Sequence, residues 1–194
     1  DKTPIDYLEE SQEGKSWLEE LGNPKEDLNL LQPLKKAIED KDFEEVESIK
    51  KKFIMHLNFA LFDAIKEDEE LAIALVDNSQ RLNLSLSETN EIKETPLILA
   101  CLMNKPKIAN AILCQAKAQD IAINAKDEYG MTAFILACEN GWTDIVAMML
   151  EMAQELKIDL NTKDEWKKTG FIWACYYKHP EVINLILAKA ESLQ

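Results

Sequence analysis

The chain has 194 residues, of which 46% are hydrophobic and 30% charged, a balance that excludes an intrinsically disordered polypeptide. Only five Gly and six Pro are present, which argues against an all-β fold with many turns. The formal net charge is −14, and residues 1–94 carry −12 of it. A field of this sign repels phosphate backbones, so nucleic acid is not an expected partner.

Membrane insertion and disulfide stabilisation are not expected either. No run of residues approaches the roughly 18 apolar positions that a membrane span needs. The four Cys show no C-x-x-C spacing, which predicts free thiols in a reducing compartment, here the cytoplasm. The sequence begins with Asp1 instead of Met, which favours a fragment or a processed product of a longer chain.

In chain order, the first elements are short helix pairs. Residues 33–46 and 59–76 each combine two apolar helical stretches, whereas residues 1–27 carry only a remnant of such a pair at Thr3–Tyr7. The longest polar break runs from Asp77 to Glu94. Its Asn and Ser residues favour turns, and we interpret it as a long loop within one domain.

Three similar segments follow with a constant period. Residues 95–101, 132–138 and 169–175 each run from a Thr to a Cys, and their starts are 37 residues apart. The Thr predicts the start of a short helix. Cys101, Cys138 and Cys175 share the apolar face of that helix, and we interpret them as small buried residues in a seam between helices.

A second helix is predicted after each of these segments. Gly141 can take positive φ in the intervening turn, and Thr143 then begins a helix with Ile145, Met148 and Met149 on its apolar stripe. Residues 116–120 and 152–157 are rich in helix formers, and we expect them to extend the second helix by one turn. Because neither helix can bury its apolar face alone, neighbouring pairs are expected to stack.

The segment Thr95-Pro-Leu-Ile-Leu-Ala100 resembles the T-P-L-H-x-A signature of the ankyrin repeat family. The resemblance implies an all-α solenoid of helix-turn-helix units with short β-turn fingers. The sequence departs from the family where Ile98, Ile135 and Ile172 replace His, which predicts the loss of a hydrogen bond that braces the finger. Lys167 and Lys178 also replace glycines of the finger and the turn.

The resemblance sets the expected domain organisation, a single ankyrin-repeat domain over residues 1–194. It is closest over residues 86–187, less close over 28–85 and weakest over 1–27. The expected units are a degenerate or truncated repeat at 1–27, divergent repeats at 28–53 and 54–86, and clear repeats at 87–123, 124–160 and 161–194.

The catalytic and metal-binding patterns in the sequence are incomplete. Gly14-Lys15-Ser16 lacks the first Gly of a phosphate-binding loop, and His56 and His179 lack the spaced partners of a zinc site. A cysteine nucleophile at Cys175 is not expected, because the resemblance places His179 in a turn and the thiol in the core. We therefore expect no enzyme activity, no catalytic residue, no metal and no cofactor.

The resemblance implies that finger tips and the ends of first helices contact a partner. Ile92, Tyr129 and Trp166 occupy equivalent finger positions and are all large, and Tyr176 and Tyr177 cannot both face a core because they are adjacent on a helix. An alternative is that Tyr129 and Trp166 only pack against the next finger. The predicted partner-binding residues are Ile92, Met103, Tyr129, Met131, Glu139, Asn140, Trp166, Lys168, Tyr176 and Tyr177.

The expected function is a monomeric adaptor or scaffold that binds a protein or peptide on its concave finger and first-helix face. One alternative is a recognition domain cut from a larger enzyme or from a secreted bacterial effector, which would then act in the host cytosol. Another is a structural spacer in a longer array. The sequence does not name the partner, because fold does not fix function.

Overall fold

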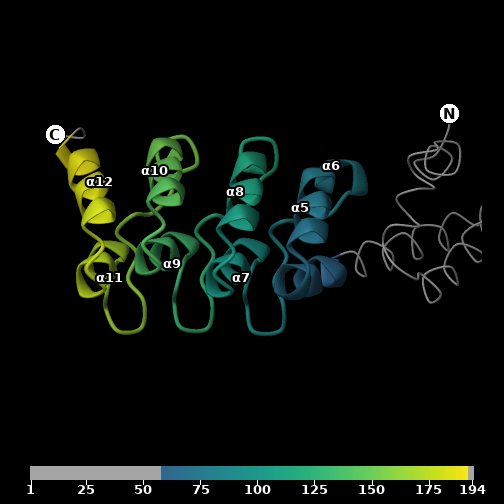
Figure 1. The fold of residues 1–194 in the computed structure, drawn as a ribbon, viewed down its shortest axis with the longest axis horizontal. Coiled ribbons are helices and arrows are strands. Elements are labelled where there is room, and N and C mark those ends of the chain that lie inside the picture. The colour runs from purple at the N-terminus through teal and green to yellow at the C-terminus, as the bar shows by residue number, and fades with distance from the viewer. Residues whose placement is uncertain (1–57, 192–194) are drawn as a thin grey trace, which may run out of the picture. The chain divides into compact units, whose positions relative to one another are not determined.

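The structure is a computed structural model that describes residues 58–191, and no strand occurs among them. The repeats predicted at 1–27 and 28–53, with Gly14-Lys15-Ser16 and His56, lie outside the described residues. Helical residues 58–67 precede the labelled helices of Figure 1. These are α5 (Glu69–Asp77), α6 (Ser79–Leu82), α7 (Pro96–Leu102), α8 (Pro106–Gln115), α9 (Ala133–Glu139), α10 (Thr143–Met152), α11 (Gly170–Tyr176) and α12 (Pro180–Glu191).

The helices form two rows. Helix α9 lies between α7 and α11 in the first row, and the second row runs α5, α8, α10, α12. Figure 1 shows the second row above the first, with the connecting loops on the opposite side of the first row. Side chains such as Leu97, Ile108, Phe134 and Met149 fill the space between the rows and are at most 2% exposed. This confirms the predicted all-α helical repeat fold.

Each first helix begins at the Thr that the sequence predicts. The hydroxyl oxygens of Thr95, Thr132 and Thr169 accept hydrogen bonds from the backbone N–H three residues on, at 3.3, 3.2 and 3.4 Å. Each bond satisfies a donor that the first turn of a helix leaves unpaired. The Thr repeat therefore sets the register of the stack.

A left-handed residue follows the C-cap of each first helix. Asn104, Gly141 and Lys178 have φ of 55°, 69° and 62°. In the turn at Gly141, the Trp142 N–H donates to the Ala137 carbonyl at 3.0 Å, and the other two turns contain the equivalent bond. This is the Schellman pattern, which reverses the chain into the second helix.

The fingers are short turns braced by an Asp or Asn side chain. Asp127 N–H donates to the Met131 carbonyl at 3.1 Å, and Asp164 N–H donates to Lys168 in the same way at 3.0 Å. Asp127 Oδ1 also accepts from the N–H groups of Tyr129 and Met131, at 2.9 and 2.8 Å. Ile135 and Ile172 replace the His of the family signature. In these two repeats the carboxylates of Asp127 and Asp164 brace the finger instead.

The predicted one-turn extension of the second helices is wrong. Helices α8 and α10 end at Gln115 and Met152, and the residues after them form hydrogen-bonded turns. Lys157 adopts a left-handed φ of 52°, which reverses the chain toward the next finger. The buried side chain of Ile158 follows directly and anchors the new direction in the core.

The polar stretch from Asp77 to Glu94 is only partly a loop. Helix α6 occupies Ser79–Leu82 and ends at Asn83, which has a φ of 54°. The Ser79 hydroxyl is buried, donates to the Val76 carbonyl at 2.6 Å and accepts from Gln119 Nε2 at 2.6 Å. This side-chain pairing stabilises a helix that turn propensity alone does not predict.

Candidate functional site

Five aromatic side chains gather where two fingers meet helix α11. We name this group the aromatic cluster: Tyr129, Trp166, Trp173, Tyr176 and Tyr177. Tyr129 and Trp166 lie in the second and third fingers, and the other three lie on α11 or at its C-cap. Trp166 is 57% exposed and Tyr176 65% exposed, so the cluster presents a large apolar surface to solvent.

Trp173 is the centre of the cluster. Its ring stacks on Tyr177, with centroids 5.7 Å apart, and meets Trp166 and Tyr176 edge to face at 6.3 and 5.7 Å. Tyr129 stacks on Trp166 at 6.1 Å with an interplanar angle of 18°. Such arrangements are the favoured geometries of aromatic pairs and hold each ring in place.

One cation lies on this surface. The Lys168 ammonium is 3.9 Å from the centroid of the Trp173 ring and 4.6 Å from that of Tyr176. Both distances are within the range of a cation–π interaction. The cluster therefore already accommodates one positively charged group.

Carboxylates surround the rings. Glu128 raises the pKa of the Tyr129 hydroxyl, both through its charge and through a hydrogen bond, and Glu165 acts in the same direction. Burial raises the pKa of Tyr177, and the Glu139 carboxylate, which accepts a hydrogen bond from it, adds to this effect. Burial also raises the pKa of Glu139, which Tyr177 and Lys168 partly offset.

The scaffold under the cluster is fixed by hydrogen bonds. Glu165 N–H donates to the Tyr129 carbonyl at 3.0 Å and joins the two finger tips. The buried Asp164 carboxylate accepts from the Trp173 indole Nε1 at 2.6 Å and from the Lys168 backbone N–H at 2.8 Å. These bonds hold the third finger against α11, so the rings occupy a preorganised surface.

The structure brings only some of the predicted site residues together. The structure brings together Tyr129, Trp166, Lys168, Tyr176 and Tyr177, and Glu139 joins them through Tyr177. In the preceding repeat Ile92 and Met103 are exposed, at 49% and 44%. The exposed side chain of Asn140 donates from Nδ2 to the Cys101 carbonyl at 3.0 Å and so also links two repeats.

Met131 does not belong to the surface. It is 5% exposed, so its prediction as a partner-binding residue is wrong. Glu94 and Lys168 stand at the equivalent positions of the neighbouring fingers and are half-buried. The position thus lies at the edge of the core, and the apolar Met131 side chain packs inward where charged ones do not.

Trp173 is the residue that sequence reasoning missed. It aligns with Leu99 and Leu136, which are buried, and this alignment hides its role. Its spacing was the available signal, because residues 173, 176 and 177 fall on one helix face at i, i+3 and i+4.

The repeated cysteines do not all lie in the seam. Cys101 and Cys138 are buried, and burial raises the pKa of the Cys101 thiol to about 12 and that of Cys138 further. Cys175 is exposed, contrary to the prediction, because no further first helix follows α11 among residues 58–191. Its thiol therefore lacks the cover that α9 gives to Cys101, whose Sγ lies 3.8 Å from the Ala133 carbonyl.

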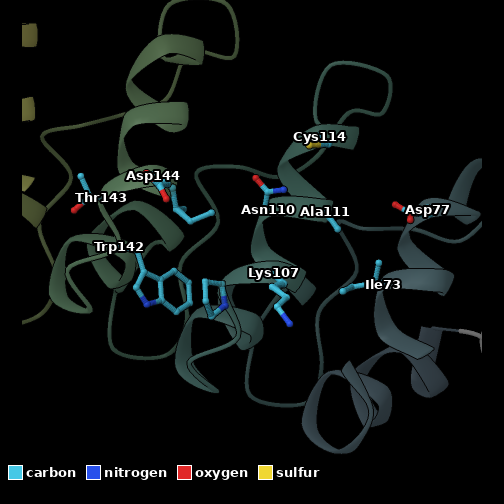
Figure 2. Close-up of a pocket in the computed structure, with 11 residues that line it drawn as sticks. Ile73, Asp77, Lys107, Asn110, Ala111, Cys114, Trp142, Thr143 and Asp144 are labelled. Carbon is cyan, nitrogen blue, oxygen red and sulfur yellow. The ribbon is translucent and has the colours of Figure 1, made fainter. Parts of the chain in front are cut away.

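A groove also lies among the second-row helices. It is an open groove of about 750 Å³ between α5, α8 and the start of α10, lined by apolar side chains such as Ile73 and by charged ones such as Asp144. Figure 2 shows Trp142 beside the start of α10, Lys107 near the start of α8, and Cys114 farther along α8. Trp142 Nε1 donates to Asn104 at 3.2 Å, and Lys107 pairs with Glu69 at 2.9 Å. Each of these pairings links two neighbouring helix pairs.

The described residues contain no group of three His, Cys, Asp or Glu that could hold a metal ion. In the same part of the chain, none of the helices has the length and apolar composition to cross a bilayer.

Stacked helix pairs with a constant period, capped by Thr and linked by turn fingers, define a helical repeat protein. Comparison with known families identifies the repeat: residues 117–194 match the family described as ankyrin repeats (3 copies). Residues 117–194 are therefore similar to ankyrin repeats, as the repeat signature indicates. No curated protein matches the chain. Ankyrin repeats are generally protein–protein interaction modules, and domains of this kind are typically not enzymes.

Proposed function

We propose that the chain is a non-catalytic adaptor that binds a protein or peptide through the aromatic cluster. The observation that carries this proposal is the exposure of four aromatic side chains that pack around the half-buried Trp173 on a hydrogen-bonded scaffold. A soluble surface seldom leaves so many rings in solvent, and rigid aromatic residues are the usual anchors of interfaces. The free state of all four thiols supports a reducing compartment as its location.

The test is affinity purification with a variant that removes the finger aromatics. Tyr129→Ala combined with Trp166→Ala should lower the affinity for a captured partner about tenfold or more. The melting temperature should stay nearly unchanged, because both side chains are about half exposed.

Phe59→Ala is the matched control, since Phe59 is 56% exposed and lies in the helical residues 58–67, outside the cluster. It should retain the partner. Equal capture by all variants would contradict the proposal, whereas the absence of any selective partner would favour a structural spacer. A large drop in melting temperature without a binding defect would mean that Tyr129 and Trp166 only pack the fingers together.

A further inference from the structure

The chemistry of the partner can be inferred from what already lies on the cluster. The Lys168 ammonium sits over the faces of Trp173 and Tyr176 at 3.9 and 4.6 Å, and Lys168 is half-buried. Ring faces carry the negative part of the aromatic quadrupole, so they favour a cation and disfavour an anion. The free chain thus fills its own cation-binding position with a side chain from the third finger.

The charges around the cluster favour a further cation. The carboxylates that act on its tyrosines and on Glu139 belong to Asp127, Glu128, Glu139, Asp164 and Glu165, whereas the cation that acts there is Lys168. The Asp164 carboxylate already accepts hydrogen bonds from the Trp173 indole and the Lys168 backbone N–H. Glu128 and Glu165 are exposed at the finger tips, where they can pair with an incoming donor.

From this juxtaposition we propose that the aromatic cluster binds an arginine side chain of a basic peptide, whose guanidinium displaces the Lys168 ammonium from the faces of Trp173 and Tyr176. This inference rests on the proposed function and specifies its partner. A guanidinium is planar, stacks on aromatic faces and offers five donors, so it can cover a ring while pairing with a finger carboxylate. An ammonium such as that of Lys168 has no planar face to stack on a ring and is more strongly hydrated, which makes it the weaker occupant.

The test uses two synthetic peptides of alternating glycine and arginine, or glycine and citrulline, with blocked ends. Citrulline has the same shape as arginine without its charge. Binding to the full chain is followed by calorimetry and tryptophan fluorescence at low ionic strength, where the arginine peptide should bind at least about tenfold more tightly.

Two variants locate the binding. Tyr176→Leu keeps an apolar side chain but removes a ring face, and it should weaken the arginine peptide about three- to fivefold. Lys168→Gln should strengthen it about threefold, because the position is vacated. Lys163→Gln removes the same charge from an exposed residue of the third repeat and should have a smaller effect.

The inference would be overturned if Lys168→Gln and Lys163→Gln raised the affinity equally and Tyr176→Leu did not lower it. The peptide would then bind only through the net charge of the chain. Equal affinity for both peptides would also overturn it. If a captured partner is nevertheless lost when Tyr129 and Trp166 are replaced, the proposed function stands and only the assignment of arginine fails.

Discussion

Asp164 and Asp127 occupy the same finger position but have different tasks. Both carboxylates accept backbone N–H groups of their own finger, as Asn90 does with its amide oxygen in the preceding one. Only Asp164 also accepts an indole N–H, because Trp173 replaces the Leu136 of the preceding repeat. The second oxygen of Asp164 must therefore remain an acceptor.

Asp164→Asn should thus destabilise the chain by about 1–3 kcal/mol, since one orientation of the amide opposes its NH₂ to the indole donor and the other opposes it to the Lys168 N–H. Asp127→Asn should cost less than about 0.5 kcal/mol. Urea unfolding measures both. Adding Trp173→Leu should recover part of the loss in Asp164→Asn, and equal effects of the two Asn variants would contradict this assignment.

Glu139 and Asp159 should give opposite pH dependence. Burial raises the pKa of Glu139, so the folded chain binds its proton more tightly, and its contribution to the free energy of unfolding falls as pH rises through the carboxyl range. Hydrogen bonds from the Thr162 hydroxyl and the Asn161 backbone lower the pKa of Asp159, whose stabilising contribution is present above its unfolded pKa and is lost on acidification.

Measured from pH 3 to 7, Glu139→Gln should therefore gain stability relative to the parent chain as pH rises, and Asp159→Asn should lose it. Denaturant unfolding at each pH gives the two differences. Parallel curves for the parent and Glu139→Gln would show that Glu139 titrates alike in both states.

At the scale of elements, the starts of the first helices could be predicted from sequence, and the ends of the second helices could not. Thr95, Thr132 and Thr169 act through bonds three residues away, so a local pattern suffices. The ends of α8 and α10 depend on where the chain must turn to bury Ile121 and Ile158, and helix propensity does not record that requirement. Helix α6 was not predicted for a similar reason, because it depends on the contact between Ser79 and the distant Gln119.

The turns between paired helices can be tested by substitution. A Cβ at Gly141 would lie 2.5 Å from His179 Nδ1 in addition to adopting a φ of 69°, so Gly141→Ala should destabilise by about 1–3 kcal/mol. Lys178 bears its Cβ at a φ of 62°, and Lys178→Gly should stabilise by about 0.5–1 kcal/mol. Thermal unfolding distinguishes the two signs, and destabilisation by Lys178→Gly would mean that its side chain contributes more than its backbone strain costs.

At the scale of the molecule, the thirty-seven-residue period predicted which helices would be neighbours. The same period placed Tyr129 and Trp166 at equivalent finger positions. It could not predict that Trp166 and Lys168 would meet the rings of α11, because this depends on the side-chain directions in the third finger and on α11. The assembled cluster therefore emerged only with the structure, whereas its finger residues were predicted.

Thiol accessibility reports on the stacking of the repeats. With Ellman's reagent under native conditions, the exposed Cys114 and Cys175 should react quickly, and Cys101 and Cys138 should react only on unfolding, because burial holds their thiols protonated and out of contact with the reagent. Cys114→Ser combined with Cys175→Ser should abolish the fast phase. Rapid reaction of all four native thiols would contradict the buried seam.

The hydrogen bond from the Glu165 N–H to the Tyr129 carbonyl fixes the two finger tips relative to each other. The rings of Tyr129 and Trp166 are therefore already aligned before a ligand binds, so little conformational entropy is lost on association. Replacing one ring also removes the stacking support of the other, so the energetic penalties of the two substitutions should not add, and the double variant should cost less than the two single variants together.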